Sequence, residues 1–245
     1  MKRFFYLSAI LVTALLYSQK AIAQEKERIL AEGDEKKMFE KKFRWGLSWN
    51  QYWATIKGDN LPREYFAKPC IGGNLRAEYY FLPFMGVGVG AGIQQRGAGI
   101  INIDNYGTPF THPWEPNYDP DSTYRERLRI TTFEVPVTLL LRTPKDIIKG
   151  VRLSGAIGLV WINNNDVVDF FNKPEDGFHT STDVTNDYIA SDLGYQMSLG
   201  TDIIAAESCI LQFHLVYSKG TKNVYKTGPG DGQVETYGFR VAWLF

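Results

Sequence analysis

The sequence predicts an all-β fold, an eight-stranded antiparallel up-and-down transmembrane β-barrel, on three observations. Large apolar residues recur at every second position in eight separate segments. The connections between these segments alternate between long and short. The last segment ends on an aromatic residue, Phe245, with no further chain to cover its apolar face. A period of two indicates strands with different surroundings on their two faces, and strands in lipid must close into a barrel to pair their backbone groups.

The first 23 residues have the pattern of an export signal. Lys2 and Arg3 precede an apolar core, Phe4 to Tyr17, which is too short to span a bilayer. Ala21-Ile22-Ala23 has the small-x-small spacing of a cleavage site, so the mature chain is expected to begin at Gln24. A membrane anchor is the alternative. Residues 24–42, which are dense in Glu and Lys, are expected to form a solvated periplasmic lead-in, and residues 43–245 the barrel.

The third expected strand carries a ladder of glycines, at every second position from Gly86 to Gly92. The ladder does not fit the G-x-G-x-x-G nucleotide loop, and no helix-like segment follows it. Inward-facing glycines would instead leave room in a narrow lumen for long side chains from other strands. Tryptophans on the apolar face of the first strand suit contact with lipid and with interfacial aromatic girdles. The first three strands are expected at about Phe43 to Ile56, Cys70 to Leu82 and Phe84 to Arg96.

A change of phase interrupts the alternation in the fourth expected strand. Leu128 and Ile130 lie in one phase and Phe133 in the other, which one extra residue near Thr131-Thr132 would explain as a bulge. Long polar loops are expected on either side of the fourth and fifth strands, at Gly97 to Glu126 and Asn163 to Asp187. The remaining strands are expected at about Arg127 to Arg142, Val151 to Trp161, Ser191 to Ile204, Ile210 to Ser218 and Val234 to Phe245.

The lengths of the connections orient the expected barrel. Outer-membrane barrels have short periplasmic turns and longer external loops. The chain is therefore expected in the cell outer membrane with both termini in the periplasm. A soluble sandwich or lipocalin-like barrel is an alternative, because alternation also fits one buried and one solvated face. The export signal and Phe245, which resembles the insertion signal of bacterial barrel proteins, favour the membrane barrel.

Charged residues recur on the faces expected to point inward. Eight strands enclose a space just wide enough for side chains, and burying an unpaired charge costs roughly several kcal/mol. We therefore expect a paired charge network that plugs and stabilises the barrel, with a narrow polar pore as the alternative. The expected network consists of Arg44, Arg76, Glu78, Arg96, Glu134, Arg152, Asp202 and Arg240.

The sequence offers few catalytic or metal-binding patterns, and no catalytic, cofactor or metal residues are predicted. His214 and Ser218 share an inward face, which loosely resembles lipid-A-modifying barrels, but those motifs space the residues differently and also need an orienting carboxylate. Asn117, Asp119 and Asp121 resemble the start of a calcium loop. Ser122 occupies the position of the expected turn glycine, and Leu128 occupies the position of the last ligand, which is a glutamate in calcium loops. Only a weak cation site is therefore expected.

Several stretches match barrel motifs of one family: FMGVGVGAGIQQRG, FEVPVTLLLR with Glu134 and Pro136, LQFHLVYSKG, the ending YGFRVAWLF, and a signal ending Ala21-Ile22-Ala23-Gln24. On these stretches the chain, from about Phe43 to Phe245, resembles the PorT family of outer-membrane β-barrel proteins from Bacteroidota. The resemblance implies the barrel fold and a link to type IX secretion and gliding. It implies no catalytic residues.

The expected function is a non-enzymatic, structural or interaction role, as an accessory of type IX protein secretion. A small porin-like channel and a lipid A-modifying enzyme are the alternatives. The expected partners are outer-membrane lipid, the barrel-assembly machinery through Phe245, and secretion-system proteins. A formal net charge of +0 predicts no nucleic-acid partner. The candidate external partner loop contains Tyr106, Phe110, Trp114 and Tyr118, which could equally pack on one another.

Overall fold

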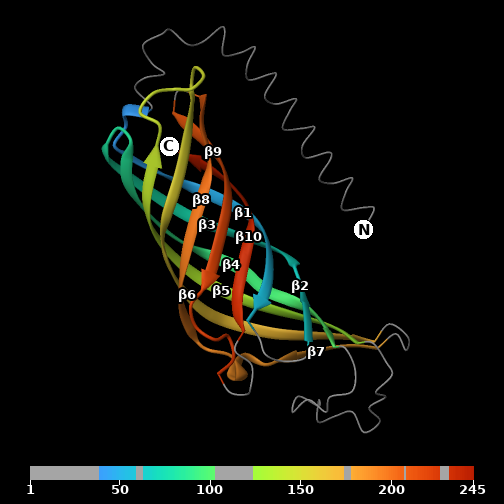
Figure 1. Cartoon of the computed structure of the whole chain (residues 1–245). Coiled ribbons are helices and arrows are strands. Elements are labelled where there is room, and N and C mark those ends of the chain that lie inside the picture. The colour runs from blue at the N-terminus through green and yellow to red at the C-terminus, as the bar shows by residue number, and fades with distance from the viewer. Residues whose placement is uncertain (1–38, 59–62, 103–123, 174–177, 207, 227–231) are drawn as a thin grey trace.

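The computed structural model describes residues 39–58, 63–102, 124–173, 178–206, 208–226 and 232–245 (Figure 1). These residues form an almost purely β structure. No helix among them is long and apolar enough to cross a membrane. The elements are β1 (Phe43–Lys57), β2 (Arg63–Phe66), β3 (Lys68–Leu82), β4 (Met85–Asn102), β5 (Tyr124–Arg142), β6 (Val151–Lys173), β7 (Phe178–Asp183), the 3-10 helix η1 (Thr185–Asp187), β8 (Ser191–Ala206), β9 (Cys209–Gly220) and β10 (Gln233–Leu244).

Eight of these strands close into an antiparallel up-and-down barrel. Strands β1, β3, β4, β5, β6, β8, β9 and β10 each pair with the next in chain order, and β10 returns to pair with β1. The closed ring leaves no free edge along the barrel wall, so the backbone groups of the wall are paired with one another. The predicted fold class and its eight strands are confirmed.

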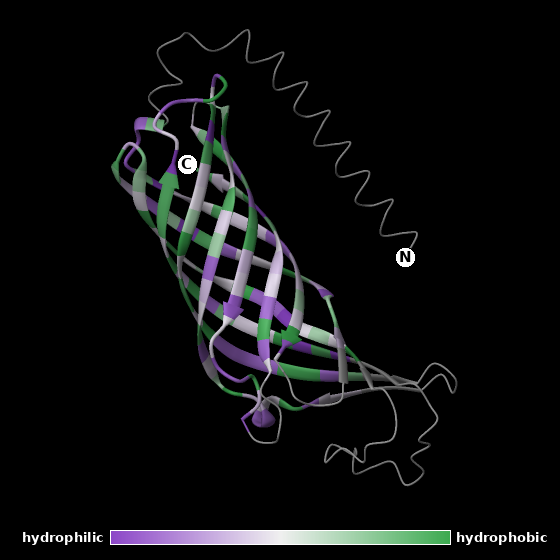
Figure 2. Ribbon diagram, viewed as in Figure 1, coloured by the Kyte–Doolittle hydropathy of each residue, from purple (hydrophilic) through white to green (hydrophobic). Residues whose placement is uncertain are grey.

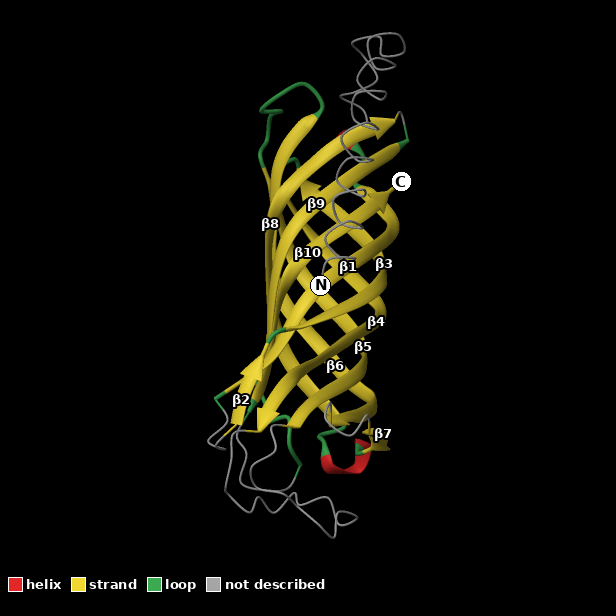
Figure 3. Ribbon diagram, turned by 90° about the vertical axis from the view of Figure 1, so that its right-hand side faces the viewer, coloured by secondary structure: helices red, strands yellow, loops and turns green. Residues whose placement is uncertain are grey.

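The two ends of the barrel differ (Figures 1 and 3). The C-terminus and the connections β3–β4, β5–β6 and β8–β9 lie at one end, called here the short-turn end. The opposite end, called the long-loop end, carries β2, which pairs with β4, together with β7, which pairs with β6, and η1. The alternation of long and short connections predicted from the sequence is therefore present in the structure.

Parts of the two predicted long loops are strands instead. Strands β4 and β5 stay paired as far as Asn102 and Tyr124. Strand β6 continues to Lys173 and pairs with β7, within a stretch predicted to be loop. Ile100 and Val167 of these extensions are buried among apolar side chains, and each is followed by another apolar residue, so no period of two marks them as strands. The sequence pattern therefore ends before the strands do.

The change of phase predicted in β5 does not occur. Leu128 and Ile130 are buried in the same phase as Thr132 and Glu134, and all four point inward. A register irregularity does lie at Thr131/Thr132, but there Thr131 and Thr132 pair with Asp166 and Asn164, so the extra residue is Asn165 of β6. The pattern changes because the interior itself turns from polar to apolar toward the long-loop end.

The outward face of the barrel is a band of large apolar side chains, and Figure 2 shows the alternation of hydrophilic and hydrophobic residues along the strands. Water-soluble monomers do not expose apolar area on this scale. The barrel strands contain 12 to 23 residues, whereas about 9–11 suffice to cross a bilayer. The architecture is that of a transmembrane barrel. The band includes Trp45, Leu47, Leu75, Val89, Ile93, Val137, Leu141, Ile157, Leu159, Leu193, Leu199, Leu215, Tyr237 and Trp243.

Candidate functional site in the barrel interior

The interior contains three layers. The long-loop end is filled by apolar side chains, the middle by charged and hydrogen-bonded ones, and the short-turn end by arginines around Phe39. Each layer draws on several strands, because inward positions of all eight strands meet in the narrow lumen. The apolar layer, called here the loop-end seal, consists of Ile56, Ala98, Ile100, Leu128, Ile130, Val167, Val224, Tyr225 and Val234.

The middle layer contains an ion pair between Arg96 of β4 and Glu134 of β5. The Nε of Arg96 lies 2.5 Å from Oε1 of Glu134, and both side chains are buried. The Thr132 hydroxyl donates to the same carboxylate oxygen at 2.9 Å, and Nη2 of Arg96 donates to Oγ of Ser218 at 3.2 Å. The contact with Ser218 connects the pair across the lumen to β9. The ion pair and the hydrogen bonds offset the cost of burying the Glu134 carboxylate inside the barrel.

A second ion pair joins Arg76 and Glu78, which are neighbours on the inward face of β3. Nη2 of Arg76 lies 2.8 Å from Oε1 of Glu78. The other oxygen of Glu78 accepts from Nε2 of Gln212 and from the Tyr80 hydroxyl, each at 3.4 Å. The small size of glycines on β4 makes room for such side chains: a Cβ at Gly86 would lie 3.0 Å from the Tyr80 ring.

Asp202 of β8 is the centre of a third cluster. The Ser154 hydroxyl donates to Oδ1 of Asp202 at 2.5 Å and lies 2.8 Å from Nε2 of His214. Nη1 of Arg44 lies 3.9 Å from Oδ2 of Asp202, and Nη2 of Arg240 lies 3.4 Å from Nδ1 of His214. The cluster joins side chains from β1, β6, β8, β9 and β10, which no pattern within one segment could have predicted.

Two serines, an aspartate and an arginine surround the imidazole ring of His214. In a triad the carboxylate holds one imidazole nitrogen while the other contacts the nucleophile. Asp202 lies 3.5 Å from Nε2 of His214, and Oγ of Ser198 lies 3.1 Å from Nδ1. Ser154 also lies 2.8 Å from Nε2, and Nη2 of Arg240 lies 3.4 Å from Nδ1 and donates to Oγ of Ser198 at 3.2 Å. Ser154, His214 and Asp202 are almost fully buried. The arrangement therefore suits a structural hydrogen-bond network better than acyl transfer.

His214 and Ser218 share the inward face of β9, as predicted, but have different partners. The Ser218 hydroxyl accepts a hydrogen bond from Arg96, whereas His214 contacts Ser154 and Ser198. Four residues along a strand separate two side chains by about 13 Å, since each residue rises roughly 3.3 Å. Sharing an inward face therefore did not bring them together. The inward-facing serines of neighbouring strands were the signal that could have identified the histidine's partners.

Arg152 lies at the short-turn end and not within the middle layer. Its Nε is 2.7 Å from Oδ1 of Asp146, in the turn between β5 and β6, and its guanidinium lies 4.2 Å from the centre of the Phe39 ring. The other seven residues of the predicted network are buried in the lumen. Arg152 differs because it is the second residue of its strand, where the wall meets the turn.

Phe39 closes the short-turn end. Its side chain is 1% exposed and packs with Ile204, Ile210 and Leu244. Its carbonyl oxygen accepts a hydrogen bond from Nη2 of Arg142 at 2.7 Å. The expectation of a solvated lead-in is therefore wrong at Phe39, because an aromatic residue beside a ring of arginines gains both apolar and cation–π contacts. Residues 1–38, with the predicted export signal, lie outside the described part of the chain.

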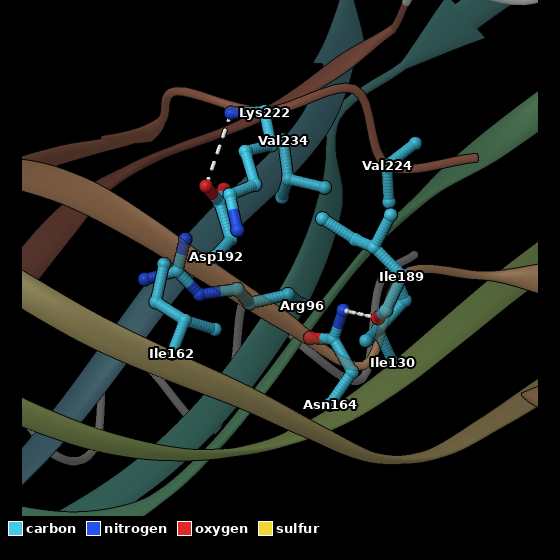
Figure 4. Close-up of a pocket in the computed structure, with 9 residues that line it drawn as sticks. All are labelled: Arg96, Ile130, Ile162, Asn164, Ile189, Asp192, Lys222, Val224 and Val234. Carbon is cyan, nitrogen blue, oxygen red and sulfur yellow. Dashed lines mark hydrogen bonds between the residues drawn. The ribbon is translucent and has the colours of Figure 1, made fainter. Parts of the chain in front are cut away.

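The cavity shown in Figure 4 lies where the middle layer meets the loop-end seal. Its volume is about 20 Å³, and its lining includes Arg96, Asp192 and Ile130. The backbone N–H of Lys222 donates to Oδ1 of Asp192 at 3.0 Å across its rim. A space of this size holds about one water molecule, so it cannot receive a substrate. The described residues also contain no group of three or more His, Cys, Asp or Glu that could hold a metal ion.

Two predicted sites fall outside the described residues. The candidate partner loop, with Tyr106, Phe110, Trp114 and Tyr118, belongs to residues 103–123. The candidate cation residues Asn117, Asp119 and Asp121 belong to the same segment. Both remain predictions from the sequence.

Searches against known proteins found similarity only among solved structures: no protein-family model and no curated protein matches the chain. Ail, the attachment invasion locus protein of Yersinia pestis, is 14% identical with a TM-score of 0.38, over 84% of this chain and 100% of Ail. Neisserial surface protein A is 9% identical with a TM-score of 0.44, over 82% and 96%. The outer membrane protein OprG from Pseudomonas aeruginosa is 12% identical with a TM-score of 0.42, over 83% and 94%. These values are too low to transfer any activity to this chain.

Proposed function

We propose that this chain is a non-enzymatic, integral β-barrel protein of the bacterial outer membrane with a structural or interaction role. The observation that carries the proposal is the outward apolar band around a closed ring of strands, with charged side chains gathered inside. This distribution is favoured when the outward face contacts the hydrocarbon of a membrane, where apolar side chains are stable and polar ones are not. The closed barrel also pairs its own backbone N–H and C=O groups, as a chain in lipid must.

The interior supports a stabilising role and argues against transport or catalysis. The ion pair Arg96–Glu134 joins β4 to β5, the Arg76–Glu78 pair of β3 is hydrogen-bonded to Gln212 of β9, and the loop-end seal and Phe39 fill the two ends of the lumen. A conducting pore would need a continuous polar path, and a lipid-modifying enzyme would need a reactive group within reach of lipid. Ser154, His214 and Asp202 are enclosed by the wall and its other side chains.

The finer assignment is that the long-loop end faces the outside, that both termini lie in the periplasm, and that the protein is a PorT-type accessory of type IX secretion. Its partners would be secretion-system proteins and, during assembly, the barrel-assembly machinery acting through Phe245. Support for the orientation comes from the alternation of short and long connections. Support for the secretion role comes from the sequence resemblance alone.

Cell fractionation tests the membrane assignment. The mature chain should sediment with outer membranes, resist extraction by high salt and alkaline carbonate, and be released by detergent. Recovery in the aqueous fraction without detergent would overturn the proposal.

A deletion strain separates the proposed role from its rivals. Loss of type IX cargo export, with no conductance of the purified protein in planar bilayers and no mass change in lipid A, would support the accessory role. Stepwise conductance would favour the channel, and a lipid A mass change lost on His214→Ala would favour the enzyme. Normal export in the deletion strain would contradict the secretion role, and cross-linking from residues 103–123 in intact cells would then search for another partner.

A further inference from the structure

The outward face of β1, β10, β9 and β8 contains an apolar groove that distinguishes it from the rest of the band. Its volume is about 760 Å³, within the roughly 300–1,000 Å³ typical of ligand clefts. Its lining includes Trp53, Tyr237, Phe239, Leu215 and Leu199. Leu215 and Leu199 are 72% and 68% exposed, so the middle of the groove is left uncovered by the chain itself.

The strand register explains the shape of the groove. One row across the strands contains Trp53, Tyr237, Tyr217 and Met197, and the next row contains Phe239, Leu215 and Leu199. Trp53 stacks on Tyr237 with ring centres 6.3 Å apart and an interplanar angle of 18°. The row with Trp53, Tyr237 and Tyr217 is bulkier than the row with Leu215 and Leu199 beside it, and both rows run across the strands.

A polar and cationic rim borders the groove toward the long-loop end. Lys219 lies directly opposite Glu235 in the register, and Lys57 Nζ lies 3.4 Å from Oε2 of Glu235. The other oxygen of Glu235 accepts a hydrogen bond from the Tyr217 hydroxyl. Lys57 is thus paired with Glu235, Lys219 lies on the strand beside that carboxylate, and the Lys57 side chain is 66% exposed. The rim carries a net positive charge together with tyrosine, a residue enriched where lipid chains meet headgroups.

We propose that this groove binds one phosphorylated acyl lipid of the surrounding leaflet, with an acyl chain along Leu199 and Leu215 and its phosphate at Lys57 and Lys219. The proposal rests on the membrane location argued above. Along the membrane normal the apolar groove is followed by the cationic rim. The acyl chain and the phosphate headgroup of such a lipid follow one another in the same order. A second copy docked on this face would bring the same lysines together at the same depth, which disfavours a dimer.

Native mass spectrometry of the detergent-purified full chain can test this site with two probes. Dioleoyl phosphatidic acid and dioleoyl phosphatidylcholine have the same acyl chains and differ only in headgroup. The ratio of their affinities therefore measures the contribution of the headgroup contacts at the cationic rim. We expect one tightly held phosphatidic acid per chain, bound about tenfold more strongly than phosphatidylcholine. The double variant Lys57→Gln/Lys219→Gln should lose that preference.

Two further variants give the comparison its controls. Lys42→Gln/Lys145→Gln removes the same charge from exposed positions at the short-turn end and should keep the preference. Leu215→Trp should fill the groove and weaken binding of both lipids, while the gel shift of the folded barrel on heating shows that each variant folds. Equal affinity for the two lipids, equal losses in both lysine variants, or a dimer that survives Leu215→Trp would overturn the site. A chain that stays in solution without detergent would instead overturn the membrane assignment itself.

Discussion

The inward and outward faces of the same strands contrast most clearly on β5. Val137 and Leu141 point outward and are 57% and 44% exposed, whereas Glu134 and Thr138 point inward and are buried. A water-soluble barrel would show the opposite distribution. Alternation along the strand therefore determines which residues share a face. The surroundings of each face, hydrocarbon outside and the packed lumen inside, determine which face carries the charged residues.

The largest effect is expected from removing a charge inside. Glu134→Gln keeps the shape of the side chain but leaves Arg96 without its counter-charge, 2.5 Å away in the wild type. Breaking a buried pair on one side costs about 3–5 kcal/mol. Guanidinium titration of protein refolded into lipid vesicles should show this loss in the free energy of unfolding.

A double variant sharpens the same point. Arg96→Met/Glu134→Leu replaces both partners by apolar groups. It should recover most of the stability lost by the single change, because a buried ion pair rarely stabilises a protein more than well-packed apolar side chains of similar volume do. A double variant as unstable as Glu134→Gln would show that the ion pair contributes more to the free energy of unfolding than the cancellation of two buried charges.

The loop-end seal should respond as an ordinary hydrophobic core. Leu128 is fully buried among apolar neighbours from several strands. Leu128→Ala should therefore cost about 2–5 kcal/mol through lost contacts and the cavity left behind. The same titration measures it, and an unchanged midpoint would mean that the seal is not packed in the folded barrel.

A charge placed on the outward face should be penalised according to depth. Val137→Arg should cost about 2–4 kcal/mol if Val137 lies near the middle of the bilayer. The adjacent inward change Thr138→Val keeps the side-chain volume and is expected to cost no more than about 1.5 kcal/mol, since it removes one long hydrogen bond to the Gly88 carbonyl. If the two variants were equally stable, the outward face would not be in hydrocarbon.

The smallest effect concerns the hairpin beyond the barrel wall. The Asp183 carboxylate accepts hydrogen bonds from the Thr185 hydroxyl at 2.7 Å and from its backbone N–H at 3.0 Å. These bonds hold the pKa of Asp183 below its ordinary value. The resulting stabilisation is present above the unfolded-state pKa and is lost as pH falls through the folded-state pKa. Carbon-detected NMR titration in micelles should show this pKa rising in Thr185→Val, and an unshifted value would contradict the contact.

Much of the barrel could be predicted from the sequence, because lipid and a packed lumen impose opposite demands on neighbouring residues. The pattern located eight strands and placed Arg44, Arg76, Glu78 and Arg240 on inward faces. It failed at Leu128 and Ile130, where the lumen is apolar and inward residues resemble outward ones.

The partners of the inward residues could not be predicted in the same way. Ser154 and His214 are 60 residues apart in sequence and meet only because β6, β8 and β9 are neighbours in the ring. Phe39 was missed because a single aromatic residue in a charged stretch carries no periodicity. Such contacts depend on strand register and on the stagger of the closed barrel, which the alternation alone does not determine.

Site-directed spin labelling along β5 tests the division between the two faces most directly. Single cysteines from Phe133 to Leu141, in a background where Cys70 and Cys209 are replaced by serine, would be labelled in lipid vesicles and probed with oxygen and a water-soluble nickel complex. The structure predicts a period of two, with odd-numbered positions accessible to oxygen and even-numbered positions shielded from it. Oxygen access at the even positions, or access to the nickel complex at the odd ones, would contradict an outward face in hydrocarbon.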